Sequence, residues 1–570
     1  MPEHASANDA ASAWRARAQR LQAAVAALAA PVGPLLTQAL NALASGEHAQ
    51  AVEQARAALA IDPRCGPAWR IAALALEGQG ELVQALEAHQ SSLALEGESA
   101  DLLEDLGRLS LDLGMADVAV QLLARALAAD PASPHLTAQL ARALAGGHDY
   151  SQAIEVLRAA IAADVENAFL WNALGAVLLQ QGDAANALTF FEQALSLAPD
   201  LIEPLYNRAG AKLDLDDLAG ALADCDAALE HAAPQQTAPI RFVRSLVRLT
   251  QGELAGGWAD YEARLEPDFA KAPVFRIDAS RWTPDDDLAN RRLLVVGEQG
   301  LGDEIMFAGM IPDVLAALGP GGRLSLAVEP RLVALFARSF PGAAVSAHAT
   351  GKADGRPLRT APGAGSEIEL WAPMASLARR FRPDLASFAA PAGYLTPDPA
   401  RLAYWRAALS QTDDRPKVGL VWKSLQTGGD RRKQYAPFEA WAPVLRTPGV
   451  RFVNLQYGDC EAELAQARAL GVDIWTAPDL NLTRDIEGAA ALSAATDLVL
   501  GVGNASANLA GACGVPLWLS LPPAAWPRLG APTYPWFAGS RVFVAERFGE
   551  WEPVMAGMAG ALEHWSHQLI

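Results

Sequence analysis

The sequence predicts an α + α/β protein, in which a solenoid of paired helices precedes two lobes that are each built on a parallel sheet. Two observations predict this fold class. A pattern with a period of 34 residues runs through the first half of the 570-residue chain, and such periods are typical of helical repeats. In the second half, short runs of aliphatic and β-branched residues alternate with helical patterns, which favours doubly wound parallel sheets.

The repeat is clearest in LWNALGAVLLQQGDAANALTFFEQALSLAPD (170–200). Trp171 is expected to fill the groove between two paired helices, while Gly175 lets the helices approach closely. Pro199 ends the second helix, because proline cannot continue the hydrogen-bond ladder. The unit resembles the tetratricopeptide repeat (TPR) through eight positions: Trp171, Leu174, Gly175, Gly182, Ala187, Phe191, Ala194 and Pro199.

Steps of 34 residues keep this pattern in register over about 200 residues. A small residue near the start of the second helix recurs six times: Ala51, Ala85, Ala119, Ala153, Ala187 and Ala221. A second series of small residues runs in parallel: Ala58, Ser92, Ala126, Ala160, Ala194 and Ala228. Glycines precede four of the six second helices: Gly46, Gly80, Gly114 and Gly182. We therefore expect six repeats in register.

A degenerate seventh unit follows in RFVRSLVRLTQGELAGGWADYEARLEP (241–267), with Gly252, Trp258 and Tyr261. We expect this unit to close the core of the array and to dock onto the next domain. A capping helix is expected at the other end, within residues 1–30, so that the array spans residues 31–265. Stacked helix pairs of this kind form a concave surface that binds segments of other proteins.

The remaining chain divides into a proline-rich polar linker (266–290), a first lobe (291–400), a second lobe (401–548) and a C-terminal helix (549–570). A break near 395–415 separates two sets of expected strands. The first set comprises 292–297, 323–328 and 367–370, and the second comprises 418–422, 451–456, 497–502 and 516–521. Ligands bind at the carboxyl ends of such strands, so the loops that follow them are the candidate site.

Composition and charge exclude several functional classes. The net charge is −20, and residues 1–270 hold 16 basic against 35 acidic residues, a net charge of −19. Such an excess argues against nucleic-acid binding there, and its simplest explanation is that acidic helix faces keep an extended array soluble. No apolar run is long enough to span a membrane and no secretory signal is visible. The four cysteines lie far apart, so a reducing, cytoplasmic location is expected.

The first candidate loop is GEQGLGDEIMF (297–307), directly after the first expected strand. Gly300 and Gly302 permit a tight turn from strand to helix. Asp303 and Glu304 then fall in the first helical turn, where the helix dipole stabilises negative charge. The two acids are therefore either functional groups or simple helix caps. The spacing matches neither a P-loop nor a dinucleotide-binding motif.

Two further loops carry polar groups after strands of the second lobe. WKSLQTGGDRRKQYAP (422–437) gathers four cations: Lys423, Arg431, Arg432 and Lys433. Such donors stabilise a phosphate or a carboxylate, but a solvated basic loop is the alternative. In the other loop, Gly503, Asn504, Ser506 and Asn508 surround a helix start whose amides are suited to a phosphate.

These loops, together with VGLVWKS (418–424), FVNLQYGDC (452–460) and DLVLGVGNASANLAGACGVPLW (497–518), resemble TPR-linked glycosyltransferases related to the bacterial heptosyltransferases. The resemblance covers about 292–548, and within that group it points to alphaproteobacterial flagellin O-glycosyltransferases. It implies a GT-B fold, in which two Rossmann-like lobes face a cleft, and an inverting transfer that needs no metal and no cofactor besides the substrate nucleotide sugar.

The resemblance also implies an activity. A nonulosonic acid of the pseudaminic type is transferred from a CMP-activated donor to Ser or Thr of flagellin, which the TPR array holds. Asp303 matches the acid that heptosyltransferases use as catalytic base, and a positioned carboxylate can take the proton of an attacking hydroxyl. The expected donor-binding residues are Gln299, Gly300, Gly302, Lys423, Arg431, Arg432, Lys433, Gln456, Tyr457, Gly503, Asn504, Ser506 and Asn508.

The sequence departs from the wider family at the third loop. The family has Asp-Thr where Gly503 and Asn504 stand, and His where Asn508 stands. The departure favours a different donor class over loss of activity, but two alternatives stay open. One is a transferase that moves a neutral sugar from UDP or ADP to another protein or a glycolipid. The other is an inactive TPR interaction scaffold. Gln456 and Tyr457, which end a strand, either contact the nucleotide or serve packing.

Overall fold

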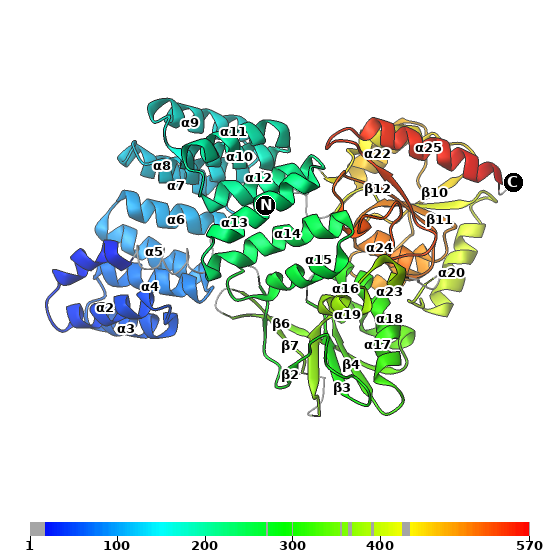
Figure 1. Ribbon diagram of the computed structural model, residues 1–570, viewed down its shortest axis with the longest axis horizontal. Coiled ribbons are helices and arrows are strands. Elements are labelled where there is room, and N and C mark those ends of the chain that lie inside the picture. Colours follow the sequence, from blue (N-terminus) through cyan, green and yellow to red (C-terminus); the bar gives the residue numbers. More distant parts are fainter. Residues whose placement is uncertain are drawn as a thin grey trace.

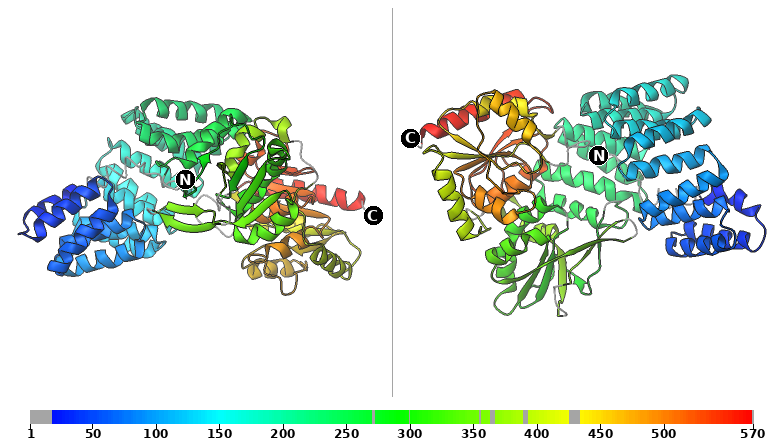
Figure 2. Two further views of the ribbon diagram at one scale, coloured as in Figure 1. Left: turned by 90° about the horizontal axis from the view of Figure 1, so that it is seen from below. Right: turned by 180° about the vertical axis from the view of Figure 1, so that it is seen from behind.

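The computed structural model describes residues 18–269, 272–298, 300–353, 356–362, 367–388, 393–424 and 434–568. Figure 1 shows a helical array on the left that joins two α/β lobes on the right, with one lobe above the other. Figure 2 shows the same arrangement from below and from behind. The predicted order, a helical TPR solenoid followed by parallel sheets, is confirmed.

Seven helix pairs follow one another along the described part of the array, six repeats and the seventh unit. They are α2 (Val32–Ala44), α3 (His48–Ile61), α4 (Gly66–Gly78), α5 (Leu82–Glu96), α6 (Ala100–Asp112), α7 (Ala116–Ala129), α8 (Pro134–Gly146), α9 (Tyr150–Ala163), α10 (Ala168–Gln181), α11 (Ala184–Leu197), α12 (Ile202–Asp214), α13 (Leu218–His231), α14 (Thr237–Gln251) and α15 (Leu254–Tyr261). Residues 18–26, which precede α2, are also helical.

The residues of the repeat motif explain these pairs. The four predicted turn glycines all adopt the left-handed backbone that glycine tolerates best: Gly46, Gly80, Gly114 and Gly182. At the two remaining turns, His148 and Asp216 adopt positive φ angles of 68° and 62° instead. Gly175 lies so close to Phe191 that an added Cβ would meet the ring at 2.6 Å. The predicted close approach of paired helices is therefore confirmed.

The end of the array packs onto both lobes. Trp258 in α15 is fully buried, and its ring packs edge-on against Phe307 of the first lobe and against Trp526 and Trp536 of the second. Its indole N–H donates to the carbonyl oxygen of Arg382 at 2.8 Å. The predicted docking of the seventh unit is confirmed, and one aromatic cluster joins the three parts of the chain.

The first lobe is a five-stranded, fully parallel sheet in the order β2-β8-β3-β4-β5. Its elements are β2 (Ser280–Arg281), β3 (Arg292–Val296), α16 (Leu301–Phe307), α17 (Ile311–Leu318), β4 (Arg323–Val328), α18 (Val333–Ser339), β5 (Ala343–Ala347), β8 (Leu370–Pro373) and α19 (Ala378–Phe381). A smaller sheet in the order β1-β7-β6 lies beside it: β1 (Val274–Phe275), β6 (Ala349–Ala353) and β7 (Arg356–Thr360).

The second lobe is also five-stranded and fully parallel, in the order β10-β9-β11-β12-β13. Its elements are α20 (Pro399–Ser410), β9 (Lys417–Leu420), α21 (Ala442–Leu445), β10 (Arg451–Asn454), α22 (Glu461–Ala469), α23 (Ile486–Ser493), β11 (Leu498–Val502), α24 (Ala505–Ala512), β12 (Leu517–Leu521), β13 (Arg541–Val544) and α25 (Trp551–Gln568). Helix α25 buries Met555, Met558 and Leu562 in the core of this lobe.

Three features differ from the predicted strands. The strand expected at 367–370 begins only at Leu370, because Glu369 stays partly exposed and accepts a hydrogen bond from the backbone N–H of Arg292. Strands β5, β6, β7 and β13 were not predicted; the first three, AAVSA, ATGKA and RPLRT, carry little β signal. The segment predicted as a linker contributes the two-residue strands β1 and β2, which are too short to show a period.

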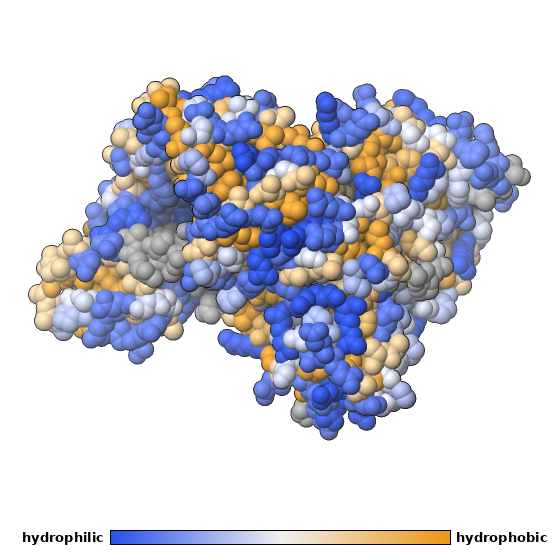
Figure 3. All heavy atoms as spheres, in the orientation of Figure 1, coloured by the Kyte–Doolittle hydropathy of each residue, from blue (hydrophilic) through white to orange (hydrophobic). Residues whose placement is uncertain are grey.

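Among the described helices, none combines the length and the apolar character that crossing a membrane requires. The space-filling view in Figure 3 shows hydrophobic residues exposed on both sides of the notch between the later repeats and the second lobe.

Candidate functional site

The strand order of each sheet places a crevice at the carboxyl ends of two neighbouring strands. In the first lobe the chain reverses direction across the sheet between β3 and β8, and in the second lobe between β9 and β11. Ligands of doubly wound sheets bind outside the carboxyl ends of the strands at such switch points. The loops that follow β3, β9 and β11 are therefore the structural candidates, and they are the three loops that the sequence analysis selected.

A cavity of about 1130 Å³ lies where these loops meet. The first lobe contributes Gly300, Asp303, Met306 and Arg331, and the second contributes Ser424, Tyr435, Asn504 and Trp526. The array reaches it as well, through Leu179, Gly210, Leu213, Asp214 and Leu246. Small-molecule sites occupy roughly 300–1,000 Å³, so the cavity is large enough for a small-molecule ligand.

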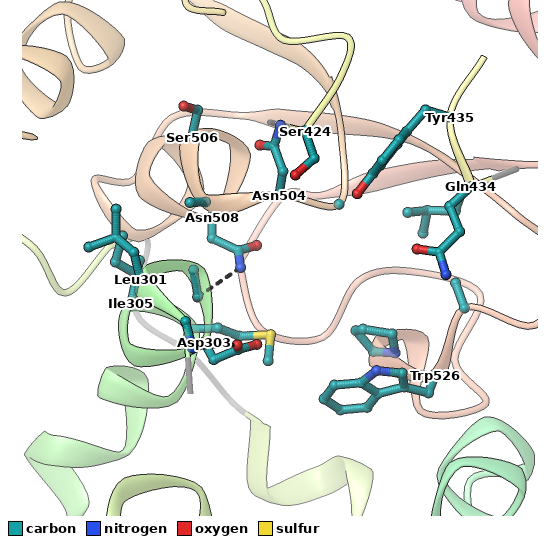
Figure 4. A pocket seen from close by; sticks show the side chains of 18 of the residues that line it. Leu301, Asp303, Ile305, Ser424, Gln434, Tyr435, Asn504, Ser506, Asn508 and Trp526 are labelled. Atoms are coloured by element: carbon teal, nitrogen blue, oxygen red, sulfur yellow. Dashed lines mark hydrogen bonds between the residues drawn. The ribbon is translucent and has the colours of Figure 1, made fainter. Parts of the chain in front are cut away.

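Asp303 stands in the first turn of α16 and faces the open cavity (Figure 4). Its Oδ2 accepts a hydrogen bond from the backbone N–H of Gly300 at 3.1 Å. Asp303 therefore caps its helix and also lines the cavity, so a role as helix cap does not exclude a functional role. The cap fixes the direction of the carboxylate, which a positioned base requires.

The neighbouring acids of this loop are engaged elsewhere. Glu304 is buried; its Oε2 accepts from the backbone N–H of Glu329 at 2.8 Å, and its Oε1 lies 3.1 Å from His348 Nε2. Glu298 is buried against Arg264, with Arg264 Nη2 2.8 Å from Glu298 Oε1. Of the three acids described in this loop, only Asp303 lines the cavity.

Helices α16 and α24, one from each lobe, approach each other at the base of the cavity. A Cβ added to Gly302 would lie 3.1 Å from the Cα of Ala505, so glycine permits this contact. Asn508 Nδ2 donates to the carbonyl oxygen of Gly302 at 3.0 Å (dashed in Figure 4). The Oδ1 of Asn508 is buried and makes no hydrogen bond among the described residues. An acceptor atom is thus left over beside Asp303.

Asn504 ties the second-lobe loops together. Its Oδ1 accepts from the backbone N–H of Ala507 at 3.0 Å, which caps α24, while its Nδ2 donates to the carbonyl oxygen of Lys423 at 3.0 Å. Gln456 is buried, and its Oε1 accepts from the backbone N–H groups of Trp422 and Lys423, both at 3.0 Å. The loop after β9 is therefore held from two sides by amide side chains.

The structure brings together most of the predicted site residues that it describes. Eight of them line the cavity: Gly300, Gly302, Asp303, Tyr457, Gly503, Asn504, Ser506 and Asn508. Figure 4 shows that Ser506 points away from Asp303. Lys423 and Gln456 do not line it. Lys423 Nζ forms an ion pair with Glu463, and the side-chain amide of Gln456 donates a hydrogen bond to the backbone carbonyl oxygen of Lys423. Gln299, Arg431, Arg432 and Lys433 lie outside the described residues.

Few charged side chains line the cavity. The charged side chains among its described lining residues are Asp214, Asp303 and Arg331. Arg331 is held by Glu329, at 2.9 Å, and by the carbonyl oxygen of Thr483, at 2.7 Å. Burial and then the negative charge of Asp303 raise the pKa of Tyr534 above its ordinary value of 10, so this phenol stays protonated beside the carboxylate.

Sequence reasoning missed several lining residues, most of them apolar or aromatic: Met306, Leu482, Tyr435, Trp526, Tyr534 and Phe548. Met306 and Tyr435 lie within two of the selected loop segments but are apolar or aromatic, and the others come from segments outside the three loops. The dense aromatic segment AAWPRLGAPTYPWF (524–537) was the available signal. Among the described residues, no group of three or more His, Cys, Asp or Glu side chains is placed to hold a metal ion.

Comparison with known proteins decides the family. Over 535 residues the chain is 44% identical to Protein FlbA of Caulobacter vibrioides, which covers 93% of this chain and 90% of that protein. The chain belongs to the FlbA family. Residues 36–95 and 139–202 match the tetratricopeptide repeat family, so this member of the FlbA family contains TPRs.

Two further similarities are to tetratricopeptide repeat proteins. Tetratricopeptide repeat protein 36 of Bos taurus is 35% identical over 121 residues, which is 20% of this chain and 62% of that protein. A crystal structure of a tetratricopeptide repeat protein from Parabacteroides merdae is 19% identical, with a TM-score of 0.36, and covers 40% of this chain and 91% of that chain.

Proposed function

We propose that this protein is a cytoplasmic O-glycosyltransferase with a GT-B fold, which transfers a nonulosonic acid from a CMP-activated donor to Ser or Thr of flagellin. One observation carries the proposal: a positioned carboxylate, Asp303, lines a cavity bounded by the carboxyl-end loops of two parallel sheets and by the TPR array. The donor, the acceptor and the flagellar context come from the resemblance of residues 292–548 to flagellin O-glycosyltransferases.

The transfer step requires a base, a leaving group and a site from which water is excluded. As the acceptor hydroxyl oxygen bonds to the anomeric carbon, its proton passes to Asp303. The bond from that carbon to the phosphate oxygen breaks, and the nucleotide leaves with the electron pair. We place the leaving phosphate at the start of α24, because Ala505 and Ser506 line the cavity there and backbone amides at a helix start favour anions.

The array supports a protein acceptor over a small one. Leu179, Leu213 and Leu246 come from the first helices of the last three units, and they line the same cavity as Asp303. A segment of protein held along these helices would deliver its hydroxyls directly to the carboxylate. Holding acceptor and catalytic site on one chain raises the effective concentration of the acceptor hydroxyls.

The test is transfer by the purified full chain with flagellin and three donor classes: a CMP-nonulosonic acid, UDP-sugars and ADP-sugars. Intact-mass measurement should show added nonulosonic acid with the CMP donor, and none with the Asp303→Asn variant. Addition of a neutral sugar from UDP or ADP would replace the proposed donor. No addition with any donor would leave a TPR scaffold as the function.

A specific observation weighs against the inactive scaffold. At the positions where the chain departs from the wider family, Asn504 and Asn508 each make ordered hydrogen bonds: Asn504 to Lys423 and Ala507, and Asn508 to Gly302. Their contacts hold the second-lobe loops and the contact between the lobes. Residues left behind by lost activity have no reason to take over such contacts, and this favours a changed donor.

A further inference from the structure

The first three repeats carry an unusual feature on their concave side. Stacked helix pairs form a superhelix with a concave surface, and we assign to that surface the first helices of the first three pairs, α2, α4 and α6. The helical segment 18–26 packs against them instead of lying only at the end of the array. Its Arg20 Nη1 lies 2.7 Å from Asp101 Oδ1 and 3.3 Å from Glu104 Oε2, both on α6.

The segment is amphipathic. Ala18, Leu21 and Val25 are 6%, 3% and 2% exposed, whereas Gln19 and Gln22 are exposed. The spacing of the three buried residues places them on one face of a helix. They share one hydrophobic cluster with Leu36, Leu40 and Leu43 of α2, with Ile71 and Leu74 of α4, and with Leu109 of α6. Figure 1 shows this dark blue segment beside the first helices of the array.

The surface beneath the segment is less exposed than the matching surface of a later repeat. Leu36 and Leu40, on α2, are 0% and 6% exposed. The corresponding residues 170 positions later, Tyr206 and Gly210 on α12, are partly exposed, and Gly210 lines the cavity. The chain therefore covers Leu36 and Leu40 of α2 with its own helix, whereas the matching positions of α12 stay open.

Charge complements this apolar contact. On α4 and α6, Arg70 pairs with Asp105 at 2.9 Å and Arg108 pairs with Glu77. Asp101 and Glu104 form ion pairs with Arg20. His135 Nε2 also lies 3.1 Å from Glu104 Oε1. Burial alone would raise the pKa of Glu104, but His135 and Arg20 outweigh it and lower that pKa. The groove thus suits a helix with an apolar stripe and one basic residue.

We propose that the concave groove of α2, α4 and α6 is a docking site for an amphipathic helix of a protein partner, and that residues 18–26 occupy it as a displaceable internal ligand. The contact is small, three apolar side chains and one partly exposed arginine, which suits reversible docking. The partner helix would carry apolar residues at the spacing of Ala18, Leu21 and Val25, and a basic residue at the position of Arg20. This inference does not depend on the proposed transferase activity.

The test uses the full chain and one probe, a fluorescent synthetic peptide with the sequence of residues 14–30. Fluorescence anisotropy should show at least ten-fold tighter binding to the Arg20→Glu/Leu21→Asp variant than to the unaltered chain, because the variant releases its own segment. The matched control is Gln19→Glu/Gln22→Asp, which adds two acids to the exposed face of the same helix and should bind like the unaltered chain. Equal binding to all three chains, or binding to none, would overturn the proposal.

A second experiment reverses charges alone, and it tests the proposal even if Leu21→Asp disturbs folding. Hydrogen exchange followed by mass spectrometry should show residues 18–26 protected in the unaltered chain and unprotected in Arg20→Glu. Combining Arg20→Glu with Asp101→Arg and Glu104→Arg should restore the protection at least ten-fold. Protection of residues 18–26 that is the same in all these chains would show that the groove does not hold the segment through these charges, and would contradict the proposal.

Discussion

At the scale of single residues, the site depends on how a few side chains divide between structural and chemical duties. Glu298 and Glu304 flank the loop that carries Asp303, yet they pair with Arg264 and contact His348 inside the protein. Asp303 differs from both, because one of its oxygens caps α16 while the carboxylate faces the cavity, where the proposed chemistry needs it. Sequence position alone selected the right loop but did not separate these roles, since all three acids are close in the chain.

We expect Asp303→Asn to remove transfer without removing the fold. The asparagine keeps a side-chain oxygen for the N–H of Gly300 but cannot take a proton, so turnover should fall by about 10²–10⁴-fold. Flagellin binding should stay unchanged, and thermal unfolding should match the unaltered chain. Turnover is measured by intact mass and binding by calorimetry. Retained turnover would assign the base to another group.

The amide of Asn508 offers a second prediction at this scale. Asn508→Ala removes its hydrogen bond to the carbonyl oxygen of Gly302, which should cost about 0.5–1.5 kcal/mol of unfolding free energy. We expect a larger effect on the KM for the donor than on acceptor binding, because Asn508 lines the cavity near Asp303. Chemical denaturation and donor titrations measure the two effects. A change in acceptor binding alone would remove Asn508 from the donor site.

At the scale of elements, close backbone approaches decide where glycine is required. Gly175 in α10 and Gly210 in α12 are both interior glycines of first helices, but their surroundings differ. A Cβ at Gly175 would lie 2.6 Å from the Phe191 ring, whereas at Gly210 the nearest atom, a methyl of Leu179, is 3.7 Å away. The TPR pattern predicted the first contact, and only the packing shows that the second position has room.

This pair of glycines makes a matched prediction. Gly175→Ala should destabilise the array by about 1–3 kcal/mol through overpacking. Gly210→Ala should be neutral or stabilise it by about 0.5–1 kcal/mol, because alanine favours helix over glycine. Urea unfolding followed by circular dichroism measures both. Similar losses in the two variants would mean that packing against Phe191 is not the reason for glycine at position 175.

At the scale of the whole molecule, a buried ionic network joins the array to the first lobe. Arg264, at the end of the array, pairs with Glu298 after β3 and with Glu262, and Ser376 donates to Glu262 at 2.7 Å. Together with the Trp258 cluster, this network places the last repeats beside the loop of Asp303. The position of the array over the cavity therefore follows from a junction that no repeat motif encodes.

The junction should respond to acid in a defined direction. Burial alone would raise the pKa of Glu262, but Arg264 and the hydrogen bonds from Arg264 and Ser376 lower it below its usual 4.5. An acid with a lowered pKa stabilises the fold above its unfolded-state pKa, and the stabilisation is lost as pH falls through the lowered value. The melting temperature of the unaltered chain should exceed that of Glu262→Gln above the ordinary glutamate pKa of 4.5, and the difference should shrink as the pH falls through the lowered pKa of Glu262. A constant difference across this range would contradict the role of the charge.

Trp258 tests the junction by packing. Trp258→Ala removes a fully buried ring, which costs about 3–5 kcal/mol in well-packed cores. We expect limited proteolysis to cut between array and lobes, and calorimetry to show separate unfolding of the two parts. Tyr404→Ala, at a side chain 59% exposed, is the control and should leave a single transition. A single transition in both variants would show that other contacts couple the parts.

The sequence by itself determined the repeats, the order of the domains and the three loops that form the site. Those features follow from local chemistry: glycine at left-handed turns, small residues at helix contacts, and aliphatic runs that end in polar loops. Only the tertiary structure decided that Lys423 pairs with Glu463, that Trp526 and Tyr534 reach the cavity, and that residues 18–26 pack against the first three repeats. These contacts join residues tens to hundreds of positions apart, so their energies depend on which surfaces meet, and no local pattern records that.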